Sequence, residues 1–252
     1  MSAPVFLGAP EDLAAARAGA VLTVRGPEAR HAVSVRRVRA GEVVDVVDGE
    51  GTRARGEVTT AAGEELAVAV TEVTREPAPA VRLVLVQALA KGGRDEQAVE
   101  TATEVGIDAV LPWQSERCVS VWAGKKAVKG RERWQAVALA ATKQSRRARL
   151  PEVEELVVGT QLLARVASVV DGGGAVVVLH EEATVPLSTV ALPEAGEVLL
   201  VVGPEGGLSQ REVSDLTERG AVVVRLGPHV MRTSTAGPVA AALLSDRLGR
   251  WS

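Results

Sequence analysis

The sequence has few of the residues that build disulfide-linked or metal-stabilised folds. Its 252 residues include one cysteine, Cys118, and three histidines, His31, His180 and His229, in separate segments. One cysteine cannot form a disulfide within the chain, and no Cys/His cluster has zinc-ligand spacing. The sequence therefore argues against a disulfide scaffold, structural zinc and metal-dependent hydrolysis, and no bound metal is expected.

Aromatic residues and long apolar runs are also scarce. The chain has no tyrosine, one phenylalanine and four tryptophans, so any surface that stacks on a nucleobase must use tryptophan. Burial habits favour core or interface positions for Trp113, Trp122 and Trp134. Apolar runs such as residues 198–202 are too short to span a bilayer, and the first twenty residues lack signal-peptide features. We expect a cytoplasmic protein with no membrane partner.

Charge is nearly balanced overall, at −3, but it is unevenly distributed. Residues 125–149 hold nine basic residues against one acidic residue, Glu132. A smaller basic group lies between residues 25 and 39, opposed by Glu28. Two such patches favour an extended polyanion, namely nucleic acid, as partner. Solvated helix and turn faces would explain either patch alone.

The rhythm of the sequence changes near residue 76. Short Val-rich runs between residues 20 and 74, separated by glycines, predict a small antiparallel barrel or sandwich. The run Glu76-Pro77-Ala78-Pro79 disfavours regular structure. We therefore predict one domain over residues 1–75 and a second over residues 76–252.

Strands and helices alternate in the second domain. Apolar runs predict strands at 81–87, 107–111, 175–179, 198–202 and 221–226. Helical spacing predicts helices at 94–105, at 128–147, after Ser209 with Glu212 completing a capping box, and at 238–248. This alternation indicates an α/β fold whose parallel sheet is covered on both faces.

Three loops at predicted strand ends have the most unusual sequence. They are His180-Glu181-Glu182, Gly203-Pro204-Glu205-Gly206-Gly207, and the segment 227–237. The carboxyl ends of parallel strands meet at one sheet edge, so the loops predict a pocket where main-chain groups contact a ligand. Ordinary turns are the alternative for each loop alone. Neither of the usual glycine-rich phosphate-binding spacings is present.

These loops resemble those of the bacterial 16S ribosomal RNA uridine-N3 methyltransferases, the RsmE-type members of the SPOUT superfamily. The resemblance rests on the runs 203–209 with Glu212 and 226–236. Other matching segments occur in the same order: His31, Val35-Arg36-Arg37, Lys91, Thr103-Glu104-Val105-Gly106, Glu116-Arg117, Arg133-Trp134, Gln144-Ser145 and Arg147. The chain departs from the family pattern in two places. Ser234 stands where many members have glutamate, and Gly92-Gly93-Arg94-Asp95 follows Lys91 where Gly-Asp-Lys is more usual.

The resemblance implies a PUA-like, RNA-binding β-barrel followed by a SPOUT-type domain with a trefoil-knotted parallel sheet. It implies a homodimer that uses S-adenosylmethionine to methylate N3 of a uridine in the 16S ribosomal RNA of the small ribosomal subunit. By position, the cofactor site would comprise Leu179, His180, Gly203, Glu205, Gly206, Leu226, Gly227, Val230 and Met231. The RNA-binding residues would be Arg25, His31, Arg36, Arg37, Lys125, Lys126, Gln144 and Arg147.

Three residues are candidates for the chemistry. Arg232 would stabilise the negative charge of a deprotonated uracil, or else bind a phosphate. Glu205 would accept the proton, or else cap the following helix. Thr235 would orient the base, or else cap the last helix.

Two other functions stay open at this point. One is a non-catalytic RNA-binding or ribosome-assembly protein, which needs no cofactor pocket. The other is a SPOUT methyltransferase that acts on ribose 2′-O or on transfer RNA.

Overall fold

The computed structural model describes residues 3–251. By their contacts these residues form two units, and the chain passes from one to the other between Ala78 and Pro79. The first unit ends at Ala78 but also includes the later segment Thr142–Leu150. The second unit comprises Pro79–Ala141 and the chain from Pro151 onward. No local sequence pattern indicates that residues 142–150 pack with the first unit.

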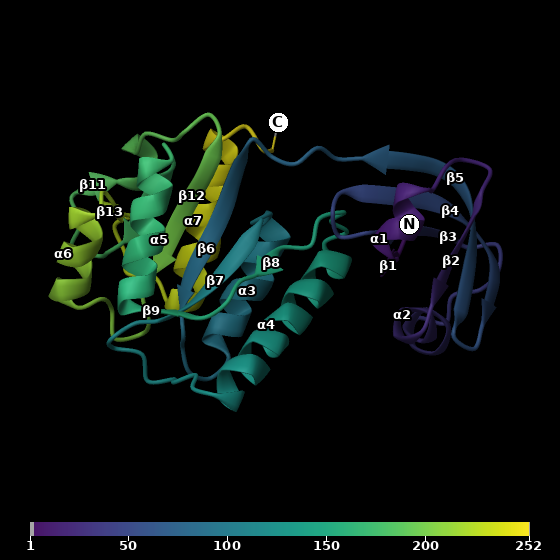
Figure 1. The fold of residues 1–252 in the computed structure, drawn as a ribbon, viewed down its shortest axis with the longest axis horizontal. Coiled ribbons are helices and arrows are strands. Elements are labelled where there is room, and N and C mark those ends of the chain that lie inside the picture. The colour runs from purple at the N-terminus through teal and green to yellow at the C-terminus, as the bar shows by residue number, and fades with distance from the viewer. Residues whose placement is uncertain (1–2, 252) are drawn as a thin grey trace. The chain divides into compact units, whose positions relative to one another are not determined.

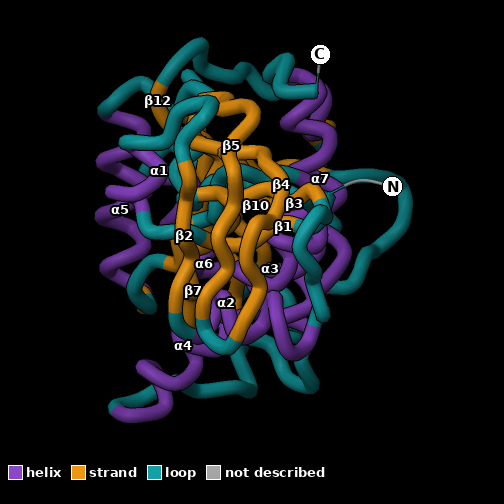
Figure 2. Tube along the Cα trace, turned by 90° about the vertical axis from the view of Figure 1, so that its right-hand side faces the viewer, coloured by secondary structure: helices purple, strands orange, loops and turns teal. Residues whose placement is uncertain are grey.

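A five-stranded sheet forms the first unit, in the order β1-β3-β4-β5-β2. Its elements are β1 (Val5–Leu7), α1 (Pro10–Ala14), β2 (Val21–Arg25), α2 (Pro27–Arg30), the π-helix η1 (His31–Val35), β3 (Val43–Val47), β4 (Thr52–Ala62) and β5 (Glu65–Arg75). The β1–β3 pair is parallel and the other pairs are antiparallel. Figure 2 shows β2, β5 and β4 side by side.

One face of this sheet is apolar. Ala54, Gly56 and Val58 alternate with exposed residues along β4, as expected for a strand with one buried face. Ala54 and Val58 contribute to a core that includes Phe6, Leu13 and Leu66, all fully buried. The predicted small antiparallel β unit is confirmed, with β1 as a parallel strand that sequence patterning missed.

An eight-stranded, wholly parallel sheet forms the second unit. The strand order is β11-β13-β10-β12-β6-β7-β8, and β9 pairs with β7. The strands are β6 (Val81–Ala88), β7 (Ala109–Gln114), β8 (Glu152–Val153), β9 (Val157–Val158), β10 (Ala175–Leu179), β11 (Val185–Pro186), β12 (Gly196–Val202) and β13 (Val222–Arg225). The helices are α3 (Arg94–Val105), α4 (Lys125–Gln144), α5 (Gly159–Asp171), the 3-10 helix η2 (Leu187–Thr189), α6 (Gln210–Glu218) and α7 (Thr233–Arg247).

Helices cover both faces of the parallel sheet (Figure 1). Val84 and Val86 of β6 share a core cluster with residues of α5 and α6. The opposite face carries α3 and α7, which pack on each other and on β6. At Gly237 of α7, an added Cβ would lie 3.0 Å from Leu85 Cδ1. A larger residue would displace Leu85, so glycine allows α7 to approach the sheet closely.

Most predicted elements are confirmed within a few residues, but the last helix was placed wrongly. It begins at Thr233 and not at Pro238. Its N-cap is Arg232, so the alternative that Thr235 caps the helix is also wrong. The predicted capping box of α6 is confirmed, because Ser209 Oγ accepts from the Glu212 amide and Glu212 Oε2 accepts from the Ser209 amide. Helix α5 and the short strands β8, β9 and β11 were not predicted.

Candidate functional site

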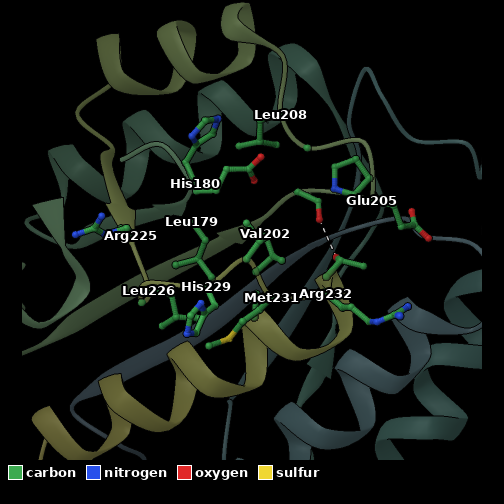
Figure 3. Close-up of a pocket in the computed structure, with 18 of the residues that line it drawn as sticks. Leu179, His180, Val202, Glu205, Leu208, Arg225, Leu226, His229, Met231 and Arg232 are labelled. Atoms are coloured by element: carbon green, nitrogen blue, oxygen red, sulfur yellow. Dashed lines mark hydrogen bonds between the residues drawn. The ribbon is translucent and has the colours of Figure 1, made fainter. Parts of the chain in front are cut away.

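The carboxyl ends of β10, β12 and β13 open into one cavity of about 430 Å³ (Figure 3). All of its lining residues belong to the second unit. They come from the ends of β10, β12 and β13, from the loops that follow these strands, from the start of α7 and from Arg94 of α3. Arg225 lies at one end of the cavity, and Glu205 and Arg232 lie at the other.

The structure brings nearly all of the expected cofactor residues together around this cavity. They are Leu179, His180, Gly203, Glu205, Leu226, Gly227, Val230 and Met231. Six further lining residues lie within the three loops that were expected to form the pocket: Glu181, Pro204, Gly207, His229, Thr233 and Ala236. Sequence reasoning missed Val202, Leu208 and Arg225, which lie beside those loops in the chain, and Arg94. Arg94 is distant in the chain, and no local signal indicated it.

Gly206 is the exception among the expected cofactor residues, because it is exposed and does not line the cavity. A Cβ at Gly206 would lie 3.3 Å from Arg117 Cβ. The Gly206 carbonyl accepts a hydrogen bond from Arg117 Nη1 at 3.1 Å. This hydrogen bond links the loop after β12 to the segment that follows β7.

Glu205 links two loops at one end of the cavity. Its Oε1 accepts from the Lys91 amide at 3.1 Å and from Arg94 Nη1 at 3.4 Å. The Glu205 side chain is 20% exposed and that of Arg94 is 36% exposed. The carboxylate thus positions the loop after β12 against the loop that precedes α3. It does not cap the following helix, whose cap is Ser209.

The other two catalytic candidates differ in position. Arg232 is exposed, lines the cavity and precedes the first turn of α7. Within residues 3–251 its guanidinium makes no ion pair or hydrogen bond. Thr235 is exposed on the first turn of α7 and does not line the cavity. Arg232 is therefore the better placed of the two to meet a substrate.

A buried hydrogen-bond network joins three of the elements that form the site. Thr233 Oγ1 donates to the Gly203 carbonyl at 2.7 Å and accepts from Gln87 Nε2 at 2.9 Å. Gln87 Nε2 also donates to the Ala88 carbonyl at 3.0 Å. These bonds connect β6, the loop after β12 and the start of α7, so they fix the relative positions of the cavity walls.

The residues expected to bind RNA are divided between the two units. Arg25, His31, Arg36, Arg37, Gln144 and Arg147 belong to the first unit, and Lys125 and Lys126 belong to the second. Arg36, Arg37 and Gln144 are exposed. Arg25 forms an ion pair, in which its Nε lies 3.7 Å from Glu65 Oε2. The run 125–149 is therefore not one patch on one unit.

Part of that basic run forms an ion pair or hydrogen bonds within the first unit. Lys143 Nζ pairs with Glu28 at 3.0 Å, and Arg149 Nη2 donates to the Glu76 carbonyl at 2.6 Å. Arg53 Nη2 donates to the Arg146 carbonyl at 2.7 Å. These bonds explain why residues 142–150 pack with the first unit.

The described part of the chain has neither a cluster of metal ligands nor a membrane-spanning helix. Residues 3–251 contain no group of three or more His, Cys, Asp or Glu side chains placed to hold a metal ion. No helix in that range has the length and apolar character needed to cross a membrane.

Two family models match the chain. An RNA methyltransferase domain matches residues 76–245, and an RNA methyltransferase PUA domain matches residues 24–71. The ribosomal RNA small subunit methyltransferase E of Mycobacterium bovis is 47% identical over 92% of this chain and 89% of its own length. The protein of the same name from Bacillus subtilis is 32% identical over 88% and 89%, respectively.

Solved structures agree on the fold. The ribosomal RNA small subunit methyltransferase E of Neisseria gonorrhoeae, solved bound to S-adenosylmethionine, superimposes with a TM-score of 0.86 at 24% identity, covering 100% of both chains. The predicted fold class, a PUA-like β unit followed by a SPOUT-type parallel-sheet domain, is thus confirmed, while the trefoil knot stays a prediction. With its two matching domains and its near full-length relatives, the chain belongs to the RNA methyltransferase family that contains the ribosomal RNA small subunit methyltransferase E proteins.

Proposed function

We propose that the protein transfers the methyl group of S-adenosylmethionine to N3 of a specific uridine in the 16S ribosomal RNA of the small ribosomal subunit. The observation that carries the proposal is the cavity at the carboxyl ends of β10, β12 and β13, built from the loops that match the family motif. The 47% identical relative named as a small-subunit RNA methyltransferase supports the choice of substrate.

The cavity suits this cofactor in size and lining. Its volume, about 430 Å³, is in the range of small-molecule sites. Leu179, Val202 and Leu226 offer apolar surface for the adenine ring, while Gly203 and Gly227 leave main-chain groups accessible. When bound, the cofactor supplies a methyl group on a positively charged sulfur, and this chemistry needs no metal.

The protein's own residues must align the uracil and stabilise its charge. Loss of the N3 proton places negative charge on O2 and O4 of the base. Arg232, at the same end of the cavity as Glu205, would offer its positive charge to those oxygens. Glu205 Oε2, which has no hydrogen-bond partner within residues 3–251, would accept the N3 proton while Oε1 holds the loops together. Thr235 would orient the base from the first turn of α7.

Both units would take part in RNA binding. Arg36 and Arg37 on the first unit and Lys125 and Lys126 on the second are exposed cations suited to phosphates. The family resemblance also implies a homodimer in the cytoplasm. Helix α7 is our candidate for part of the dimer interface, because Leu243 on it is 46% exposed.

Calorimetric titration with S-adenosylmethionine tests the pocket. Gly227 lines the cavity, and an added Cβ would meet no atom within 4 Å, so a Gly227→Leu side chain would occupy cavity space. We expect binding by the wild type and a loss of at least about tenfold in affinity in Gly227→Leu. Gly159→Leu is the matched control, because Gly159 lies outside the cavity and an added Cβ there also meets no atom within 4 Å, and it should bind like the wild type. Absence of binding by the wild type, alone and with small-subunit RNA, would favour a non-catalytic RNA-binding protein.

A further inference from the structure

We infer that a second, open cleft of the second unit binds an unpaired nucleotide of the RNA substrate, with Trp122 as its stacking surface. The inference rests on the proposed function, because it assumes that the partner is RNA. The cleft measures about 530 Å³. Its lining residues are Ala90, Lys91, Gly92, Gly93, Asp95, Glu96, Ser120, Trp122, Gly130, Arg133 and Trp134.

Trp122 is held rigidly at the edge of this cleft. A Cβ on Gly130 of α4 would lie only 2.4 Å from the Trp122 ring, so the ring packs directly on the helix backbone. The Trp134 ring meets it edge-on, with centroids 5.1 Å apart and an interplanar angle of 68°. The Trp122 amide donates to Gln114 Oε1 at 3.0 Å. An aromatic ring fixed in this way can stack on a base with little loss of side-chain entropy.

The exposed fraction of Trp122 differs from that of Trp113 and Trp134, the other two tryptophans for which core or interface positions were expected. Trp113 and Trp134 are 2% and 1% exposed, which confirms that expectation for both. Trp122 is only half-buried and lines the cleft. Its accessible surface therefore remains free for a ligand.

The charges around the cleft suit an RNA backbone. The Arg133 side chain is 69% exposed, and only its Nη2 contacts Glu96, at 2.9 Å. Lys91 is exposed, and Lys125, Lys126 and Lys129 at the start of α4 are exposed as well. The buried carboxylate of Asp95 is already engaged, since it accepts from the Ala90 and Glu96 amides. Exposed cations around an aromatic ring are typical of sites for single-stranded nucleic acid.

The cleft adjoins the cofactor cavity. Lys91 lines the cleft, and its amide donates to Glu205, which lines the cavity. Arg94 lines the cavity, while its neighbours Gly93 and Asp95 line the cleft. A base stacked on Trp122 would thus belong to a nucleotide close to the methylated uridine.

The test measures binding of the full-length protein to a fluorescent single-stranded oligouridylate of about ten nucleotides. We expect Trp122→Leu to weaken binding about tenfold, and Trp122→Phe to recover most of it, because phenylalanine stacks and leucine does not. Arg133→Gln should weaken binding a few-fold. Arg131→Gln is the matched control on the same helix, because Arg131 is held by Glu155 and the Val153 carbonyl.

A parallel titration with S-adenosylmethionine separates this inference from the proposed function. Unchanged cofactor affinity in Trp122→Leu, together with weaker RNA binding, supports a nucleotide site. The inference is overturned if Trp122→Leu binds the oligonucleotide as the wild type does, or if Trp122→Phe is as weak as Trp122→Leu. Failure of the wild type to bind the cofactor or to methylate RNA would instead contradict the proposed function.

Discussion

Replacing Thr233 by valine tests whether the buried network at the cavity holds the site together. Valine has nearly the shape of threonine but removes the hydroxyl that donates to the Gly203 carbonyl and accepts from Gln87 Nε2. Thr233 is 7% exposed and Gln87 is fully buried, so the groups left behind have limited access to water.

The size of the effect follows from the two lost hydrogen bonds. Gln87 Nε2 keeps its bond to the Ala88 carbonyl, and the half-buried Gly203 carbonyl can reach water through the cavity. Each loss is therefore at the lower end of the range for a buried polar group, roughly 1 kcal/mol. We expect a decrease of about 2 kcal/mol in the free energy of unfolding, or a fall of about 4–8 °C in Tm.

Urea and thermal unfolding measure stability, and titration with S-adenosylmethionine measures the site. Thr233→Ser is the matched control, because it keeps the hydroxyl and loses one methyl group, which costs about 1 kcal/mol. Thr233→Val should also weaken cofactor binding about fivefold, because Gly203 loses its anchor, whereas Thr233→Ser should bind normally. Wild-type stability together with wild-type cofactor affinity in Thr233→Val would refute the role assigned to the network.

Three further predictions concern other parts of the second unit. Gly130→Ala should lower stability by about 1–3 kcal/mol in urea unfolding, because its Cβ would overlap the Trp122 ring; unchanged stability would contradict this packing. Arg250→Ala should lower the free energy of unfolding by about 2 kcal/mol, because the Arg250 guanidinium donates hydrogen bonds of 2.6 and 2.8 Å to the two carboxylate oxygens of Asp108. An unchanged free energy of unfolding would contradict this prediction. Burial raises the pKa of the Cys118 thiol, so at pH 8.5 iodoacetamide should alkylate it more slowly than a free thiol and faster as pH rises; a rate equal to that of free cysteine would contradict it.

Regular elements could be predicted from the sequence where local patterns decide the structure. The helix over 94–105 and the strand over 175–179 have the predicted bounds, because apolar spacing and a terminal glycine determine them. Strands β8, β9 and β11 have two residues each, too few to show a period. The start of α7 was missed because Gly237 and Pro238 suggest a loop, whereas contact with β6 favours the helix there.

Candidate site residues followed from motif and topology together, and exceptions arise from long-range contacts. Loops at the ends of parallel strands must meet at one edge, so Leu179, Gly203 and Leu226 could be placed in one cavity beforehand. Arg94 enters the cavity from a distant helix, and Gly206 turns toward Arg117. Neither contact could be predicted from the residues next to Arg94 or Gly206 in the sequence, because each contact joins segments that are far apart in the chain.

Methyl transfer to small-subunit RNA is the measurement that tests the central claim most directly. The purified protein would be incubated with isotopically labelled S-adenosylmethionine and small ribosomal subunits that lack the modification, and the nucleosides of the product would be analysed by mass spectrometry. We predict one labelled product, N3-methyluridine, that is absent with Gly227→Leu and present with Gly159→Leu. Label on ribose 2′-O, label in transfer RNA alone, or no label with either RNA would contradict the proposed function.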